Sequence, residues 1–287
     1  MNNPAKQDLQ VPGQDAGSAR HLTTHYEAKH GVGWCYMHAS PRPCFTPQLL
    51  KEIKTWLMTE VKREQRSETG RKFRYHVLAS SVDGVFNLGG DLGLFRTLIE
   101  ERDRQGLMDY AKACIDVLHD NIVHFDIDVT SIALVQGDAL GGGFEAAISS
   151  NVLIAERGCK MGLPEILFNL FPGMGAYQLL ARKIGQSKAE QMILGGQIYS
   201  SEELYGMGIV DILAEKGEGE LALYDYIKRA ERAANGYRGV RGIRDLYNPI
   251  TYEDLRKVTQ IWVDSVLRLG SRDLRMMERL VSRQNYR

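Results

Sequence analysis

The sequence predicts an α/β fold, and two observations carry that prediction. Short apolar runs typical of buried strands alternate with helix-compatible segments from residue 75 to residue 213. Beyond about residue 217, the apolar spacing is helical only. We therefore expect an α/β core over residues 21–216 and a C-terminal helical region over residues 217–287. Residues 1–20, rich in Asn, Gln, Asp and Gly, are expected to form a disordered tail.

The core is expected to begin with a hairpin. Residues 31–38 have the character of a strand, and they would pair with a first arm that starts near Leu22. Thr46 and Pro47 then form a typical helix start, an N-cap followed by proline in the first turn. The elements expected next are a strand at 75–80, a glycine-containing loop at 85–91, and helices at 92–102 and 107–121.

The rest of the core is expected to alternate strands, turns and helices. The expected strands are 131–136, 152–155 and 210–213, the turns are 161–165 and 171–175, and the helices are 176–184, 187–194 and 201–205. Helices near 221–234, 252–269 and 272–283 would complete the chain. Because loops at the carboxyl ends of strands form the site in α/β folds, the turns that follow these strands are the candidate site.

Composition excludes several classes of protein. Thirty-six basic and 36 acidic residues give a formal net charge of zero, which does not suit a protein that coats nucleic acid. The N-terminus lacks the apolar segment of a signal peptide, and no apolar run has membrane-spanning length. The four cysteines show no short paired spacing, so they indicate neither a zinc site nor a disulfide framework. We expect a cytoplasmic protein with no membrane or nucleic-acid partner.

The most informative segment is the glycine turn at residues 137–145, GDALGGGFE. It follows the apolar run at 131–136 and precedes a helix-compatible segment, so it is expected to join a strand to a helix N-terminus. Glycines let the backbone approach a bound atom closely, and a helix N-terminus presents unpaired N–H groups. Glu145 lies just beyond the turn. Together these features indicate a place where a carbonyl oxygen becomes negative.

A second glycine turn, residues 88–91, follows the strand at 75–80. One backbone N–H from each turn, facing a single carbonyl oxygen, would form an oxyanion hole. Glu165 follows the turn at 161–164 and adds a second carboxylate to Glu145. A carboxylate beside an apolar pocket has a raised pKa and acts as a general acid or base near neutral pH.

Each of these features also has a purely structural explanation. A triple glycine often serves only to pack a strand against a helix, and a glutamate at a helix start often only stabilises the helix dipole. The turn at 137–145 matches neither the dinucleotide pattern nor a Walker loop. Ser80 and Ser81 lack the flanking glycines of a hydrolase nucleophile. Asp91 and Asp138 are expected to be turn or cap residues.

Taken in order, four segments resemble motifs of the crotonase (enoyl-CoA hydratase/isomerase) superfamily. They are VFNLGGD at 85–91, GDALGGGFE at 137–145, GLPE at 162–165 and FPGMG at 171–175. The resemblance runs from about residue 75 to residue 213 and implies a crotonase-like ββα spiral with a C-terminal helical trimerisation region. The longer strings 85–92 and 161–177, together with IWVD at 261–264, are similar to diffusible signal factor synthases of the RpfF type.

The resemblance implies roles for five residues. Gly90 and Gly142 would supply the N–H groups of the oxyanion hole, with Gly89 adjacent, and Glu145 and Glu165 would be the two catalytic glutamates. It implies no cofactor. It implies a homotrimer or hexamer that acts on acyl carrier protein loaded with a 3-hydroxyacyl chain. Dehydration and thioester hydrolysis would release a cis-2-unsaturated fatty acid, a quorum-sensing signal.

One segment departs from the wider superfamily. Residues 40–46, SPRPCFT, stand where relatives have an Asn-Arg-Pro-x-x-x-Asn segment that helps hold coenzyme A. The departure fits a carrier-protein substrate. Two other functions remain open: an enoyl-CoA hydratase or isomerase without thioesterase activity, and a non-catalytic protein that binds a partner such as a sensor kinase domain. The acyl chain length, the double-bond geometry and the division of acid and base roles are also open.

Overall fold

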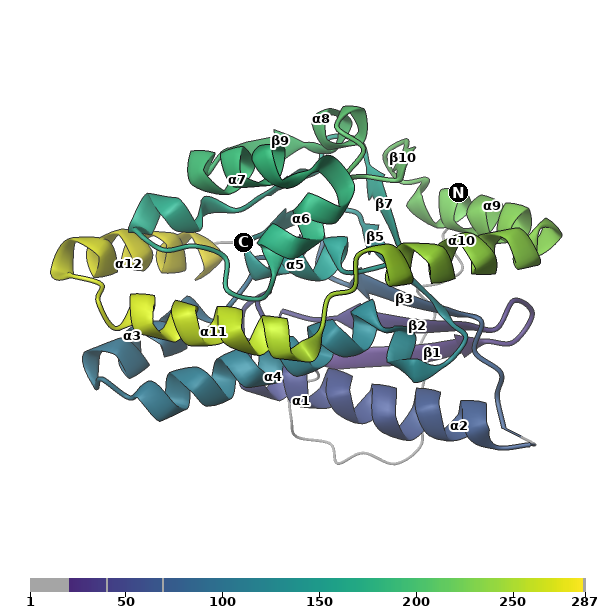
Figure 1. Ribbon diagram of the computed structural model, residues 1–287, viewed down its shortest axis with the longest axis horizontal. Coiled ribbons are helices and arrows are strands. Elements are labelled where there is room, and N and C mark those ends of the chain that lie inside the picture. Colours follow the sequence, from purple (N-terminus) through teal and green to yellow (C-terminus); the bar gives the residue numbers. More distant parts are fainter. Residues whose placement is uncertain (1–20, 40, 69, 286–287) are drawn as a thin grey trace.

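The computed structural model describes residues 21–39, 41–68 and 70–285, so the expected tail lies outside the described residues. Two sheets form the centre of the molecule, and helices surround them (Figure 1). The larger sheet has the order β1-β2-β3-β5-β7-β10. Its strands are β1 (Leu22–Glu27), β2 (Val32–Met37), β3 (Tyr75–Ser80), β5 (Thr130–Val135), β7 (Val152–Glu156) and β10 (Ile212–Ala214).

The larger sheet confirms the strands that the apolar runs predicted. β1 and β2 form the expected antiparallel hairpin, and β2, β3, β5, β7 and β10 pair in parallel. Strands of a parallel sheet are covered on both faces and therefore read as nearly continuous apolar runs. β3 and β5 fit this rule, since each has five buried residues out of six.

A second, smaller sheet was not predicted. Its order is β4-β6-β8-β9, and each strand has only three residues. The strands are β4 (Val85–Asn87), β6 (Asp138–Leu140), β8 (Lys160–Gly162) and β9 (Ile198–Ser200). The prediction of plain loops or turns at 85–91, 137–145 and 161–165 was wrong in this respect. A strand of three residues is too short to show an alternation of apolar and polar side chains, and the strands with which it pairs lie far away in the sequence.

The two sheets together form a structural unit that recurs along the chain. A long strand of the larger sheet is followed by a short strand of the smaller sheet and then by helix, as in β3-β4-α3, β5-β6-α5 and β7-β8-η4. This confirms the α/β fold and the ββα spiral that the resemblance implied. Each glycine turn therefore lies between a short strand and the helix that follows it, at the edge where the spiral turns gather.

The helices confirm most of the sequence-based expectations. Thr46 caps the first helix, because its side chain accepts a hydrogen bond from the backbone N–H of Leu49 at 3.1 Å. The helical elements are α1 (Pro47–Trp56), η2 (Leu57–Lys62), α2 (Arg63–Arg66), α3 (Leu92–Glu100), α4 (Arg104–Ile122), η3 (His124–Asp126), α5 (Gly142–Ile148), η4 (Pro164–Phe168), α6 (Ala176–Ile184), α7 (Gln186–Gly195), α8 (Ser201–Gly206), α9 (Gly219–Arg232), α10 (Ala234–Tyr247), α11 (Tyr252–Val266) and α12 (Ser271–Asn285).

One helix was missed in the sequence. α10 occupies residues 234–247, where the pattern gave no helix. Gly236, Gly239 and Gly242 explain the omission, because glycine disfavours helix interiors by about 1 kcal/mol per residue. Figure 1 shows α9 and α10 at one end of the molecule and α12 at the opposite end.

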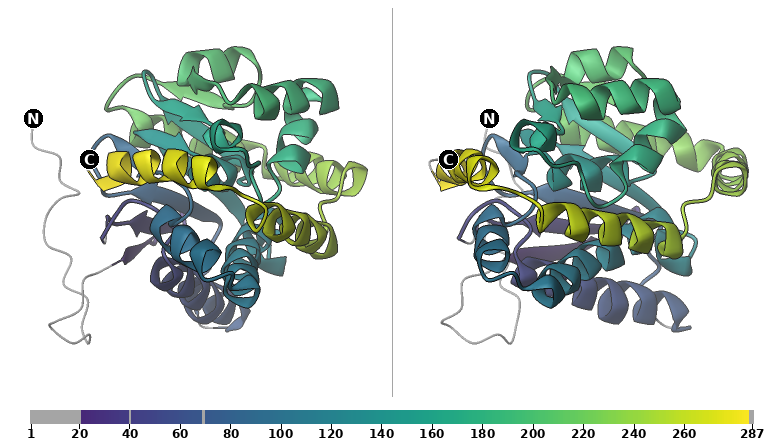
Figure 2. Two further views of the ribbon diagram at one scale, coloured as in Figure 1. Left: turned by 90° about the vertical axis from the view of Figure 1, so that its left-hand side faces the viewer. Right: turned by 60° about the vertical axis from the view of Figure 1, so that its left-hand side comes forward.

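The C-terminal helices fold back onto the core. α11 packs against α4, and α12 packs against α3 and η4. Figure 2 shows α12 across the end of the molecule that faces the viewer in its left view. The boundary near residue 217 stays a prediction. Across the described ranges, no helix combines the length and the apolarity that crossing a bilayer requires.

Candidate active site

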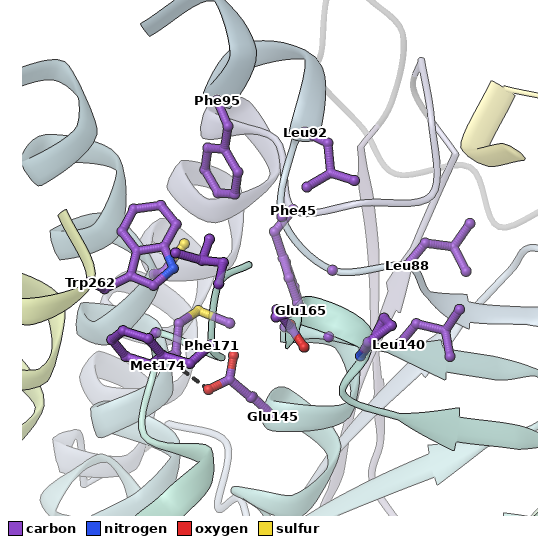
Figure 3. A pocket seen from close by; sticks show the side chains of 18 of the residues that line it. Phe45, Leu88, Leu92, Phe95, Leu140, Glu145, Glu165, Phe171, Met174 and Trp262 are labelled. Atoms are coloured by element: carbon purple, nitrogen blue, oxygen red, sulfur yellow. Dashed lines mark hydrogen bonds between the residues drawn. The ribbon is translucent and has the colours of Figure 1, made fainter. Parts of the chain in front are cut away.

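A cavity of about 620 Å³ lies between the two glycine turns, η4 and α11 (Figure 3). All five residues predicted to form the site line it: Gly89, Gly90, Gly142, Glu145 and Glu165. Apolar side chains form most of the remaining wall. They include Phe45, Leu88, Leu92, Phe95, Leu140, Phe168, Phe171 and Trp262. The cavity therefore suits a long apolar ligand whose polar end reaches the glycines and the glutamates.

The two glycine turns touch through their backbones. A Cβ placed on Gly89 would lie 2.9 Å from the carbonyl oxygen of Leu140 and 3.0 Å from the nitrogen of Gly142. A Cβ on Gly142 would lie 3.6 Å from the nitrogen of Gly90. Gly89 also has a φ of +92°, which L side chains rarely adopt. Only glycine at position 89 allows the turns to approach so closely.

The turn positions two backbone donors beside the cavity. Gly142 is the first residue of α5, so its N–H is one of the four that lack an acceptor within the helix. The partial positive charge of the helix N-terminus adds to the same place. A Cβ on Gly142 would lie 3.6 Å from the nitrogen of Gly90, so the two N–H groups are candidates to donate to one carbonyl oxygen. Two donors directed at one oxygen would stabilise an enolate or a tetrahedral oxyanion.

Glu145 is held in the first turn of α5 and is only 2% exposed. Its Oε1 accepts hydrogen bonds from the N–H groups of Met174 at 2.9 Å and Ala176 at 3.0 Å. Burial raises the pKa of Glu145 to about 7, although these two bonds act in the opposite direction. Glu145 can therefore exchange a proton near neutral pH.

Glu165 lies on η4 and faces Glu145 across the cavity, and Figure 3 shows both carboxylates directed into the same space. Its Oε1 would be 2.6 Å from a Cβ on Gly141, and its buried Oε2 has no hydrogen-bond partner among the described residues. Burial, and then the nearby charge of Glu145, raise the pKa of Glu165 to about 8. An unpartnered buried oxygen of this kind is available to a substrate.

Tyr110 and Phe45 brace the second glycine turn, and the sequence gave no sign of either role. The backbone N–H of Phe45 donates to the carbonyl oxygen of Gly89 at 2.7 Å. The Tyr110 hydroxyl accepts from the N–H of Asp91 at 3.2 Å and donates to the carbonyl oxygen of Phe45. Tyr110 comes from α4, so its place beside the turn depends on tertiary packing alone.

Two other side chains fix the ends of the same turn. Asn87 accepts from the N–H of Gly89 at 2.8 Å, and Asp91 caps α3 by accepting from the N–H of Leu94 at 3.1 Å. The capping role of Asp91 was predicted. Asp91 also pairs with Arg42 at 2.6 Å. Asp138 instead lies in β6, where its Oδ1 accepts from the N–H of Lys160 at 3.2 Å.

The arrangement supplies what proton transfer beside a carbonyl needs. Two backbone donors can hold a carbonyl oxygen, and two carboxylates with near-neutral pKa values can remove and deliver protons beside it. Within the described parts of the chain, His, Cys, Asp and Glu side chains form no cluster of three that could hold a metal ion.

The profile described as enoyl-CoA hydratase/isomerase matches residues 45–241. Mouse mitochondrial methylglutaconyl-CoA hydratase is 30% identical over 159 residues, which cover 54% of this chain and 48% of that protein. A probable enoyl-CoA hydratase of Bacillus subtilis is 29% identical over 185 residues, which cover 64% of this chain and 66% of that protein.

The solved structures agree on the fold. Human mitochondrial delta3-delta2-enoyl-CoA isomerase has a TM-score of 0.75 at 17% identity, over 92% of this chain and 98% of that one. The matched part of the chain spans about half the length of the mammalian relatives. Since the family profile covers well over half of the sequence, the chain belongs to the enoyl-CoA hydratase/isomerase family.

Proposed function

We propose that this protein transfers protons at the α-carbon of an acyl thioester and at the oxygen carried by its β-carbon. The observation that carries the proposal is the pair of glutamates, with pKa values near 7 and 8, beside two glycine N–H groups in an apolar cavity. The N–H groups would hold the thioester carbonyl as one glutamate takes the Cα proton, and the enolate would be stabilised there. The names of the hydratase relatives support this class of reaction.

We further propose that the substrate is a 3-hydroxyacyl chain on acyl carrier protein. One glutamate takes the Cα proton, and the other protonates the 3-hydroxyl, which leaves as water and gives a cis-2-enoyl thioester. A carboxylate then deprotonates a second water as it attacks the carbonyl carbon in the same hole. The C–S bond breaks, the thiolate takes the proton, and a cis-2-unsaturated fatty acid leaves as the diffusible signal.

The segment that departs from the superfamily supports a carrier other than coenzyme A. Arg42 is engaged with Asp91, Phe45 with Gly89, and Thr46 with the N-terminus of α1. These residues stand where relatives help to hold coenzyme A, and here the contacts of Arg42, Phe45 and Thr46 brace the glycine turn and a helix, although the buried Nε of Arg42 has no partner among the described residues.

The alternative is an enoyl-CoA hydratase or isomerase without the thioesterase step. This alternative function would use the same residues, and the hydratase names of the relatives favour it. A non-catalytic binding protein is the less favoured alternative, because both glutamates face the cavity with raised pKa values. A sensor kinase domain stays a proposed second partner, which a binding assay between the two purified proteins would test.

Product analysis separates the two catalytic functions. The protein would be incubated with 3-hydroxydodecanoyl carrier protein and, separately, with 2-dodecenoyl-CoA, and products would be identified by mass spectrometry. Free 2-unsaturated acid from the carrier-bound substrate supports the signal-synthase proposal. Chains that stay on their thioesters in both reactions, dehydrated from the carrier-bound substrate and hydrated or isomerised from the coenzyme A substrate, would contradict thioester hydrolysis and favour the alternative.

We also propose that the protein self-associates as a homotrimer or hexamer. On α10, an apolar stripe is left uncovered: Val240 is 70% exposed, Ile243 67%, Leu246 84% and Tyr247 89%. A second copy of the chain would remove these side chains from water. Light scattering coupled to gel filtration should give a multiple of 32.3 kDa, and L246E/Y247E should lower it. An unchanged mass in that variant would exclude this face as the contact.

A further inference from the structure

A second, smaller cavity of about 40 Å³ lies behind the active-site cavity, between α1, α4 and β3. Three residues line both cavities: Phe45, Cys114 and Met174. These side chains therefore form the partition between the two spaces. The rest of the second cavity is lined mainly by apolar residues of α1, η2 and α4, which are Leu50, Ile53, Leu57, Val117 and Leu118.

Of the three shared residues, Met174 combines a fixed backbone with an adaptable side chain. Its N–H donates to Glu145, and this bond holds the main chain in place. Its side chain has three rotatable bonds and a polarizable sulfur, so it can adjust to a ligand. Its terminal methyl would lie 2.6 Å from a Cβ on Gly142 and therefore adjoins the proposed oxyanion hole. Phe45 is tied through its backbone to Gly89, and Cys114 is buried in the middle of α4.

The second cavity can hold an alkyl chain end because it contains no charged side chain. Its polar residues are His76, Asn121 and Ser149. Asn121 donates to the Ser149 hydroxyl at 2.8 Å. Burial lowers the pKa of His76 to about 4, so its imidazole is neutral at physiological pH. An acyl chain that passed the partition would meet apolar walls and neutral groups.

We propose that Met174 limits the length of the acyl chain that the active site accepts. This inference rests on the proposed function, because it takes an acyl chain as the ligand. With methionine in place, the chain ends at the partition. Shortening the side chain would join the two cavities, and each further methylene that becomes buried would strengthen binding about fourfold.

The test compares four variants with the wild-type protein. M174A shortens the Met174 side chain and so removes its part of the partition. F45L opens the partition at Phe45 through a smaller loss of side-chain volume. M174L is the matched control, because leucine is close to methionine in volume and keeps the partition. M174A/V117F refills the second cavity, since Val117 lines that cavity but not the first. Melting curves identify the variants that fold. If M174A does not fold, F45L provides the test in its place.

Two readouts separate this inference from the proposed function. The first is the dissociation constant of saturated fatty acids from eight to sixteen carbons, measured by displacement of a fluorescent fatty acid, which needs no catalysis. The second is the product length from 3-hydroxyacyl carrier protein. M174A and F45L should move the tightest-binding acid, and the main product, to chains at least two carbons longer. M174L and M174A/V117F should keep the chain-length preference of the wild type, whatever their absolute affinity or rate.

An unchanged length preference in folded M174A and F45L would overturn the inference, as would a shift that persists in M174A/V117F. If no variant binds any of the acids, the inference also fails. Shifted binding without product formation by any protein, including the wild type, would uphold the length limit and refute the proposed thioester reaction instead.

Discussion

Replacing Gly142 with alanine should remove the oxyanion hole and leave the fold intact. The new Cβ would meet the terminal methyl of Met174 at 2.6 Å, and this flexible end can move away. Its other neighbours, Gly89 Cα at 3.5 Å and Gly90 N at 3.6 Å, are at ordinary contact distances. Alanine is also the better helix former at the first residue of α5.

The added methyl would lie 3.6 Å from the nitrogen of Gly90, and we expect it to obstruct a carbonyl oxygen that approaches both N–H groups. Losing one oxyanion donor typically costs about 3–4 kcal/mol of transition-state stabilisation, or roughly 10²–10³ in kcat. We therefore expect G142A to lose at least about a hundredfold in kcat, with a melting temperature within about 3 °C of the wild type.

The assay is steady-state turnover of carrier-bound 3-hydroxyacyl chains and of 2-enoyl-CoA, with melting followed by calorimetry. G195A is the matched control, because a Cβ on Gly195, in α7, meets nothing within 4 Å. It should retain full activity. A folded G142A that keeps kcat within threefold of the wild type would refute the assignment of this N–H to the hole.

Three further predictions concern the contact of Tyr110 with the second glycine turn and the protonation of Glu145 and Glu165. Y110F removes the hydroxyl that joins Asp91 to Phe45, so kcat should fall about tenfold with KM nearly unchanged. If the loss of kcat instead follows a loss of stability, and kcat returns to the wild-type value at low temperature, Tyr110 has only a packing role. The kcat–pH profile should be bell-shaped with its maximum between about pH 7 and 8, because one glutamate must be protonated while the other is ionised; a profile flat from pH 5 to 9 would contradict this. Stability should also depend on pH, because the folded-state pKa of Glu165, about 8, lies above its ordinary value of 4.5. The contribution of protonated Glu165 to the free energy of unfolding is complete below pH 4.5 and is lost as pH rises through 8. The melting temperature of the wild type should therefore fall between pH 5 and 9 by more than that of E165Q. Parallel curves of melting temperature against pH would show that the pKa of Glu165 is not raised.

Much of the fold could be predicted because its signals are local. Thr46 and Pro47 mark the start of α1, and the buried strands β3 and β5 are continuous apolar runs. The short strands β4, β6 and β8 have no such signal, since their identity depends on pairing between distant segments. α10 was missed because its three glycines lower the helix propensity that a local pattern measures.

The candidate site divides in the same way. The glycine turns and the two glutamates could be named from the sequence, because their motifs occur in a recognisable order, and the structure brings all of them to one cavity. Tyr110 and the partition at Met174 could not be predicted from a local pattern. Tyr110 reaches the turn from α4, and the second cavity exists only once α1, α4 and β3 have packed together.

The most direct test of the central claim is the release of free acid by glutamine variants of the two glutamates. Wild-type protein, E145Q, E165Q and the control E190Q, whose glutamate is exposed on α7, would be incubated with 3-hydroxydodecanoyl carrier protein. Mass spectrometry would measure the free 2-unsaturated acid. We predict full release by the wild type and E190Q, and a loss of at least about 10²-fold in each folded active-site variant. Wild-type release from either E145Q or E165Q would contradict the claim that the pair acts together on one acyl thioester.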